Sequence, residues 1–164
     1  MTLGWELIEV DPDTGTIEVA FTAGEQFLNP AGVVQGGFLA AMLDDTLGPA
    51  LVATLPDGQF APTLGLHVQF LRPALPGRLV GRGRIVQRGS EVCFLAGELL
   101  DSRGRPVAVA TATARITSLS KKPGRTRSTS RRPSTGMADR MVRRVPSPAP
   151  MSTTYGIWRS RRQR

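Results

Sequence analysis

The chain has 164 residues, 40% of them hydrophobic, which is enough for one ordinary domain with its own core. Its single cysteine, Cys93, excludes an intramolecular disulfide, and one cysteine with one histidine excludes a zinc-ligand set, so no structural metal is expected. No run approaches the roughly 18 apolar residues of a membrane span, and "MTLGWELIEVDPDTG" lacks a signal-peptide pattern, so we expect a cytoplasmic protein without membrane contact.

The net charge of +8 is unevenly distributed. Residues 1–120 carry eight arginines and no lysine against twelve acidic residues, whereas residues 121–164 carry eleven arginines and two lysines against Asp139 alone. The second segment is rich in Pro, Ser and Arg and lacks apolar periodicity, so we expect a disordered basic tail after a folded domain of residues 1–120. Nucleic-acid binding would involve only this tail, whose stacking aromatics are Tyr155 and Trp158, and a dispensable extension is the favoured interpretation.

The folded part is predicted to begin with a β-hairpin and a long helix. "WELIEV" and "GTIEVAF" flank the turn-forming "DPDTG", which predicts two antiparallel strands between Trp5 and Phe21. From Gly36 to Leu55 helix formers predominate, and we expect Pro49 to kink or end the helix. Apolar side chains surround nearly its whole circumference, which is typical of a buried helix.

Four strand candidates follow the helix. In the first, "TLGLHVQFL", strict alternation predicts one face with Leu64, Leu66, Val68 and Phe70 and another with Thr63, Gly65, His67 and Gln69. The other three are "RLVGRGRIVQR", "EVCFLAGELLD" and "RPVAVATATARIT", separated by the turn signals "GS" and "SRG". Two strands, one helix and four strands predict an α+β fold in which a four-stranded meander curls around the helix.

Two adjacent carboxylates, Asp44 and Asp45, interrupt this apolar helix. An unpaired buried carboxylate costs several kcal/mol, so at least one of them is expected to line a cavity or an interface. Gly36 and Gly37 lie at the helix start, where free backbone N–H groups and the helix dipole can stabilise a developing oxyanion. From Gly36 to Asp44 the helix rises about 12 Å, so the two meet one substrate atom only if two antiparallel helices face each other across a dimer axis.

The segment "NPAGVVQGGFLAAMLDDTLG", with "FLRPA" and the strands that follow, resembles the hotdog-fold acyl-CoA thioesterases of the PaaI-like (phenylacetate-pathway) group over about residues 20–117. The resemblance implies a six-stranded antiparallel sheet wrapped around one central helix. It also implies homodimers joined into homotetramers, with active sites shared across the dimer interface. The implied reaction is hydrolysis of a medium-chain or aromatic acyl-CoA without metal or cofactor.

The resemblance also assigns roles to individual residues. Asn29 matches the substrate-orienting asparagine, Gly36 the N–H donor to the thioester oxygen, Asp44 the nucleophile or general base, and Thr63 the hydroxyl that helps to place the attacking water. Gln35 stands where many members carry histidine. Its amide donates a hydrogen bond but cannot change charge.

Further substrate-binding candidates come from the helix and from the strands. Gly37 and Asp45 adjoin the catalytic candidates. Three arginines are expected near strand ends, where they either bind the CoA phosphates or simply face solvent: Arg82, Arg84 and Arg88.

His67 is expected to face solvent or an interface, and Cys93 is expected to be a small buried residue, so neither is a favoured catalytic candidate.

Two other function classes remain open. Gln35 favours a noncatalytic acyl-CoA or aromatic-ligand binding protein. A hotdog dehydratase or hydratase needs a histidine with an acid, and His67 lies in the wrong element for that role.

Overall fold

The computed structural model describes residues 2–119, so the basic tail expected after residue 120 lies outside the described residues. The chain begins with β1 (Glu6–Asp11) and β2 (Thr16–Ala23), which pair antiparallel as predicted. In the turn between them, Asp11 Oδ1 accepts the backbone N–H groups of Asp13 and Thr14. These bonds use the short carboxylate as a local turn former.

One long helix and the remaining strands follow. A short 3-10 helix η1 (Glu25–Phe27) precedes α1 (Gly36–Val52). The later strands are β3 (Gln59–Phe60), β4 (Thr63–Phe70), β5 (Gly77–Arg88), β6 (Val92–Leu100), β7 (Pro106–Arg115) and β8 (Thr117–Ser118). The helix therefore ends three residues before the predicted limit. Pro49 does not end it, because α1 continues to Val52.

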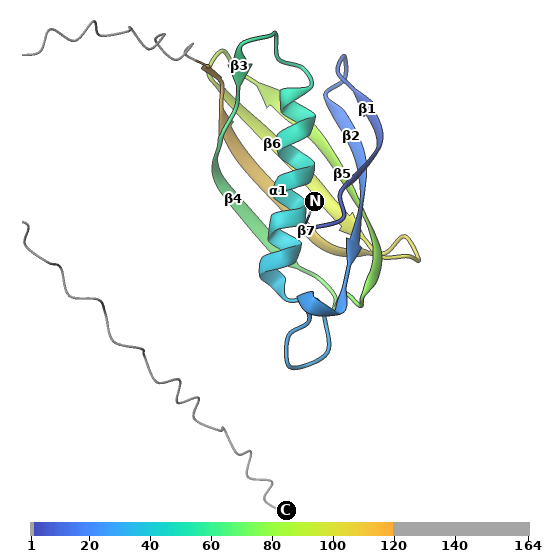
Figure 1. Ribbon diagram of the computed structural model, residues 1–164. Helices are drawn as coiled ribbons and strands as arrows, with labels where there is room; N and C mark the ends of the chain where they lie inside the picture. The colour runs from blue at the N-terminus through green and yellow to red at the C-terminus, as the bar shows by residue number, and fades with distance from the viewer. Residues whose placement is uncertain (1, 120–164) are drawn as a thin grey trace, which may run out of the picture. The chain divides into compact units, whose positions relative to one another are not determined.

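The sheet has six antiparallel strands in the order β1-β2-β5-β6-β7-β4, and α1 lies across one face of it (Figure 1). The predicted four-stranded meander is wrong: β5, β6 and β7 form a meander, but β2 occupies the place beside β5, and β4 pairs with β7 at the edge. β3 and β8 form a separate two-stranded pair. Sequence periodicity cannot detect strands of two residues. Within the described residues, no helix is long and apolar enough to cross a membrane.

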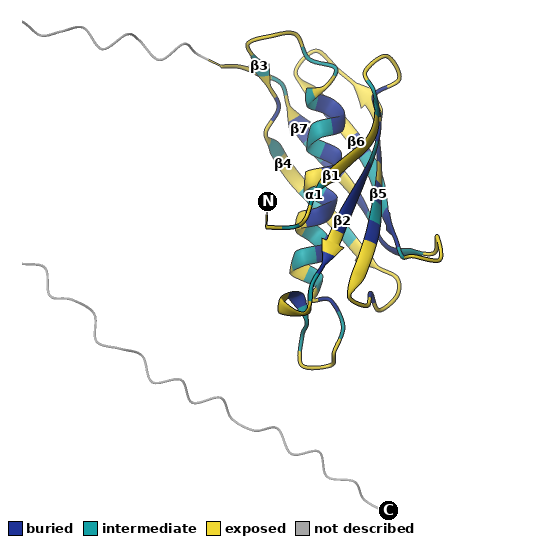
Figure 2. Cartoon of the chain, turned by 45° about the vertical axis from the view of Figure 1, so that its right-hand side comes forward, coloured by how far each residue is buried: buried dark blue, intermediate teal, exposed yellow. Residues whose placement is uncertain are grey.

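The helix is buried or half-buried over most of its circumference, as predicted for a buried helix, and only a narrow outer stripe is exposed in the single chain. Leu39, Met42, Leu43, Leu47 and Leu51 are at most 3% exposed. The residues on the outer side are small or polar, and Gly37, Ala41 and Asp45 are exposed (Figure 2). A curled sheet of one chain reaches around part of the helix, which leaves this outer stripe open.

Glycines on the inner face of the sheet allow α1 to lie close to β5 and β6. A Cβ on Gly81 would overlap the Thr46 hydroxyl, and a Cβ on Gly97 would lie 2.8 Å from Leu47 Cδ2. Thr46 is fully buried, and its Oγ1 donates to the Met42 carbonyl at 2.7 Å. The "GRGR" stretch is therefore a period-two pattern with its glycines toward the helix and its arginines outward.

Gly81→Ala is expected to destabilise the fold by about 1–3 kcal/mol, because the added methyl must displace Thr46 or push α1 from the sheet. Gly104→Ala is not a suitable control, since Gly104 has a φ of 72°. Gly65→Ala is suitable, because nothing lies within 4 Å of a Cβ there. Chemical denaturation of both variants measures the difference. Equal stability of the two would contradict close packing at Gly81.

Candidate active site

Asp44 and Thr63 form a hydrogen-bonded pair between the helix and the edge strand. Thr63 Oγ1 donates to Asp44 Oδ1 at 2.8 Å, and both residues are half-buried. The two residues are 19 positions apart in sequence. The structure thus brings together the acid and the hydroxyl that the sequence motif singles out.

Thr63 reaches Asp44 because β4 is not a regular strand. Thr63 pairs with Ala114 and Gly65 with Thr113, so Leu64 is an extra residue in the ladder with β7. The predicted alternation, which placed Leu64 on the face of Leu66 and Thr63 on the opposite face, is wrong at this end. Leu64 is 62% exposed, whereas Thr63 turns to the helix. A β-bulge redirects side chains in this way, and bulges are frequent beside active sites.

The start of α1 presents free backbone donors. The N–H groups of Phe38 and Leu39 both donate to the Gln35 carbonyl, whereas Gly36 and Gly37 precede any acceptor within the helix. Gln35 N–H itself donates to the Phe27 carbonyl at 2.8 Å. The rings of Phe27 and Phe38 stack with centroids 4.3 Å apart, which fixes the helix start against η1.

Gly36 packs directly on Phe70 at the far end of β4. A Cβ on Gly36 would lie 2.9 Å from Phe70 Cζ, so a larger residue at this position requires the ring to move. The sequence motif explains this glycine by the approach of a ligand, whereas the structure shows that it also packs on Phe70. Phe70 is the first residue of the "FLRPA" motif, but a sequence motif does not show which strand residue contacts the helix start.

Asn29 lies in the loop before α1 and shapes its turn. Its Oδ1 accepts the backbone N–H groups of Ala31 at 2.9 Å and Val33 at 3.4 Å. Because these two donors fix Oδ1 as the acceptor, Nδ2 is the atom of this amide that can donate to a ligand. Turn formation and substrate orientation are therefore compatible uses of the same side chain.

Gln35 and Gly37 lie together at the exposed beginning of the helix. Gln35 is the N-cap residue, but its side chain makes no capping hydrogen bond. A Cβ on Gly37 would lie 3.0 Å from Gln35 Oε1, so the glycine leaves room for this side chain. Both residues are exposed in the single chain.

Asp45 differs from Asp44 in environment. It lies on the exposed side of α1, and its backbone carbonyl accepts the indole N–H of Trp5 at 3.0 Å. Partial burial of the carboxyl and, second, the charge of Asp44 raise the pKa of Asp45 above its ordinary value. Two carboxylates in sequence thus have unequal surroundings, and the one bonded to Thr63 is Asp44.

The structure does not bring the three candidate arginines to Asp44 within one chain. Arg82 and Arg84 lie in the middle of β5 rather than at a strand end, because β5 extends from Gly77 to Arg88. Both line a hollow of about 630 Å³ on the sheet face opposite α1, and Arg82 pairs with Glu18 at 2.8 Å. Arg88 is at the strand end as predicted and donates to Thr54 Oγ1 at 2.9 Å.

The predicted exposure of His67 and the predicted burial of Cys93 are confirmed in the single chain. His67 is exposed and borders the hollow on the outward sheet face. Cys93 is fully buried in the core. Neither residue takes part in the hydrogen bond between Asp44 and Thr63.

Two contacts between β4 and α1 lie at opposite ends of β4. Thr63 and Asp44 meet at one end, and Phe70 and Gly36 meet at the other. Along α1, Gly36 and Asp44 are about 12 Å apart at 1.5 Å per residue, too far for both to contact one carbonyl group. The acid and the helix-start donors of a single chain are therefore separate.

Comparisons with known proteins place the chain in a family. The thioesterase superfamily model matches residues 31–108. A phenylacetic acid degradation-related protein from Ralstonia eutropha JMP134 is 48% identical, with a TM-score of 0.68, and the match covers 70% of this chain and 86% of that one. A Bacillus halodurans protein solved with CoA is 30% identical, with a TM-score of 0.59, over 61% of this chain and 66% of that one.

The PaaI protein of the Escherichia coli phenylacetic acid degradation operon shares the fold at 23% identity, with a TM-score of 0.65, over 71% of this chain and 81% of that one. The chain belongs to the thioesterase superfamily and has the hotdog fold, which confirms the resemblance to PaaI-like proteins. It is a thioester hydrolase of the acyl-CoA thioesterase class.

Proposed function

We propose that this protein hydrolyses medium-chain or aromatic acyl-CoA thioesters with Asp44 as nucleophile or general base. The observation that supports this proposal best is the 2.8 Å hydrogen bond from Thr63 Oγ1 to Asp44 Oδ1, which pairs a carboxylate with a hydroxyl beside an exposed stripe of α1. As a base, Asp44 takes a proton from water held by Thr63 while the water oxygen bonds to the carbonyl carbon. As a nucleophile, it forms a mixed anhydride that water then cleaves. In the base route the C–S bond then breaks, and Asp44 passes the proton it took from water to the thiolate of CoA. In the anhydride route CoA leaves as a thiolate, which takes up the proton that water releases when it cleaves the anhydride and restores the Asp44 carboxylate.

The helix start supplies the partner for the thioester oxygen. Gly36 N–H is the proposed oxyanion donor, with Gly37 N–H beside it and the positive end of the α1 dipole behind both. Asn29 Nδ2 orients the substrate, and the Gln35 amide supplies a further donor without titrating.

A second copy of the chain is proposed to complete each site by pairing along β4. The Leu71 N–H donates to the Val107 carbonyl at 2.8 Å, so by antiparallel alternation Gln69 and His67 also face β7. By the same alternation, the backbone N–H and C=O groups of Leu66 and Val68 point away from β7. Since β4 is the outermost strand of the described sheet, no strand of that sheet pairs with them on this side. A second β4 can bond to them and form a continuous sheet.

Antiparallel pairing centred near His67 puts the Thr63 end of one β4 beside the Phe70 end of the other. Because Thr63 holds Asp44 and Phe70 packs on Gly36, each site receives its acid from one chain and its oxyanion donor from the partner. The same pairing covers apolar side chains that are open in one chain, namely Leu64 at 62% and Phe70 at 55% exposure. We retain the homotetramer and the cytoplasm as predictions.

The relative solved with CoA supports a CoA thioester as substrate. Arg82, Arg84 and Arg88 remain proposed phosphate contacts in the assembled oligomer, since guanidinium groups bind phosphate in bidentate geometry. Asp45, which is exposed on the outer side of α1 next to Asp44, remains a proposed substrate contact.

A panel of acyl-CoAs tests the reaction and its substrate class. We expect release of free thiol from hexanoyl-, decanoyl-, benzoyl- or phenylacetyl-CoA by the purified full chain. Calorimetric titration with CoA alone runs in parallel. Gln35, which cannot act as a titrating group, favours a noncatalytic acyl-CoA binding protein as the second candidate. CoA binding without thiol release from any member of the panel would establish that alternative and overturn the first.

A further inference from the structure

Pro49 leaves one helix carbonyl without its usual donor. In an α-helix each carbonyl accepts the N–H four residues later, and four residues after Asp45 stands proline, which has no N–H. The proline ring also presses against the carbonyl of that earlier residue. Gly48 precedes Pro49, so this turn of α1 combines the two poorest helix formers. The turn that carries Asp44 and Asp45 is therefore the intrinsically weakest part of the helix.

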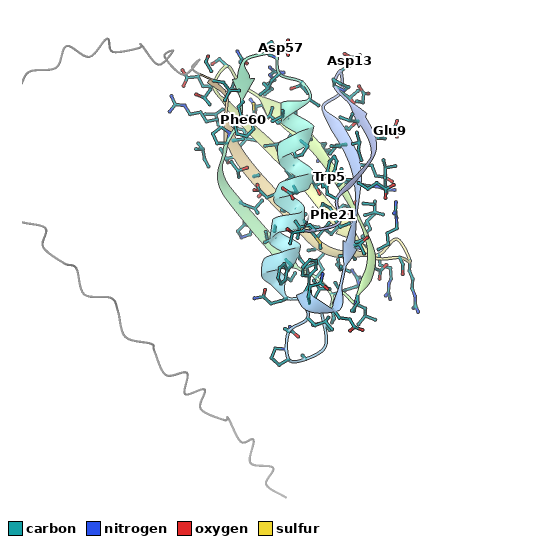
Figure 3. All side chains as sticks on the ribbon, viewed as in Figure 1. Trp5, Glu9, Asp13, Phe21, Asp57 and Phe60 are labelled. Carbon is teal, nitrogen blue, oxygen red and sulfur yellow. The ribbon has the colours of Figure 1, made fainter. Side chains whose placement is uncertain are left out.

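Trp5 supplies the missing hydrogen bond from outside the helix. Its indole N–H donates to the Asp45 carbonyl at 3.0 Å, across 40 residues of sequence. Trp5 is half-buried, packs against the core, and lies beside the middle of α1 (Figure 3). An indole N–H is a donor only, so it matches an unpaired carbonyl.

The segment that carries Trp5 is tied down at its other end. In this N-terminal strap, Leu3–Trp5, the Leu3 carbonyl accepts the Thr22 N–H from β2 at 3.3 Å. Gly4 has a φ of 61° and passes so close to Thr22 that a Cβ would lie 2.9 Å from Thr22 Cβ. The strap is thus held to β2 at one end and to α1 at the other.

We propose that Trp5 is a positioning residue for the hydrolytic reaction: its indole N–H replaces the amide that Pro49 lacks and holds the Asp44–Asp45 turn where Asp44 meets Thr63. The carbonyl that Trp5 holds belongs to the residue after Asp44. A shift of this turn changes the distance of 2.8 Å between Asp44 Oδ1 and Thr63 Oγ1. The inference rests on the proposed function of Asp44.

A double-mutant cycle distinguishes the hydrogen bond from Trp5 to the Asp45 carbonyl from the packing of the Trp5 ring. Trp5→Phe keeps an aromatic ring but removes the N–H, and Pro49→Ala restores a helix amide that can donate to Asp45. We expect Trp5→Phe to lower kcat by about three- to tenfold with KM within about twofold, because misplacement of a reacting group slows chemistry more than binding. Pro49→Ala should retain wild-type kcat. The double variant should recover to within about twofold of wild type, because the restored helix amide then satisfies the carbonyl.

The carboxyl ¹³C resonance of Asp44, assigned by its loss in Asp44→Asn, gives a readout that needs no turnover. Positioning predicts that this resonance moves in Trp5→Phe and returns in the double variant. An unmoved resonance, or a double variant as impaired as Trp5→Phe, overturns the inference. If the wild type hydrolyses no acyl-CoA, the proposed function fails, and the resonance alone decides whether Trp5 positions Asp44.

Discussion

Asp44→Asn lowers kcat for acyl-CoA hydrolysis by about 10²- to 10⁴-fold, the range expected when a general base is lost, and by more if Asp44 is the nucleophile. The amide has the same shape as the carboxylate, and its oxygen can still accept the Thr63 hydroxyl. It can neither take a proton from water nor form an anhydride. Thiol release measures the loss, and size-exclusion chromatography with circular dichroism checks that fold and assembly are unchanged.

Asp57→Asn is the matched control, because Asp57 is an exposed acid in the segment after α1 (Figure 3). Its hydrolysis should equal that of the wild type. Wild-type activity of Asp44→Asn would remove Asp44 from the mechanism. Equal losses in both variants would point to a general effect of negative charge rather than to a specific acid.

Mixed oligomers test whether Asp44 works with the helix start of its own chain. Gly36→Ala places a Cβ 2.9 Å from the Phe70 ring and so disturbs the oxyanion donor. When Asp44→Asn and Gly36→Ala chains exchange subunits at equal amounts, a shared site predicts recovery of about a quarter of wild-type activity. That fraction reflects the half of dimers that are mixed, each with one intact site. No recovery after verified exchange would mean that each chain builds its own site.

Leu64→Arg is expected to separate the dimer and to abolish hydrolysis together with it. In one chain Leu64 is 62% exposed, so arginine at this position leaves the protomer folded. In the proposed dimer Leu64 faces the Phe70 end of the partner strand, where burial of an unpaired guanidinium costs several kcal/mol. Sedimentation velocity at a series of concentrations measures assembly, and thiol release on the same samples measures activity.

Leu7→Arg, at the opposite edge of the sheet, is the matched control. Leu7 is 46% exposed in β1, the other outer strand of the described sheet. This variant should assemble and hydrolyse like the wild type. A fully active monomer of Leu64→Arg would contradict the shared site, whereas dissociation of Leu7→Arg alone would move the dimer interface to β1.

The sequence predicted most of the regular elements, because their patterns are local. Alternation and the "DPDTG" turn located the first hairpin, and helix formers located the start of α1 at Gly36. The helix end was less certain, since Pro49 lies inside the helix and not at its boundary. The Asp45 carbonyl, which Pro49 leaves without a helix donor, accepts the indole N–H of Trp5 from 40 residues away in sequence. A local pattern does not contain such a contact.

The candidate site was partly predictable for the same reason. The motif singled out Asp44 and Thr63, and the structure joins them, but it does so through a bulge at Leu64 that regular alternation does not anticipate. Phe70 and Trp5 were missed because each meets the helix from a distant element. Arg82 and Arg84 were misplaced because the alternating glycines, packed under Thr46, continue β5 past them instead of ending it, whereas Arg88 lies at the strand end as predicted.

The contacts at the two ends of β4 give this strand a fixed length. One end is tied to the acid through Thr63, and the other is closed against the helix start by Phe70. Insertion of two residues between them would preserve the inward and outward alternation of side chains, yet it would break one contact or the other. In the proposed antiparallel pair of β4 strands, the length of β4 would therefore set the separation between the two proposed reaction centres.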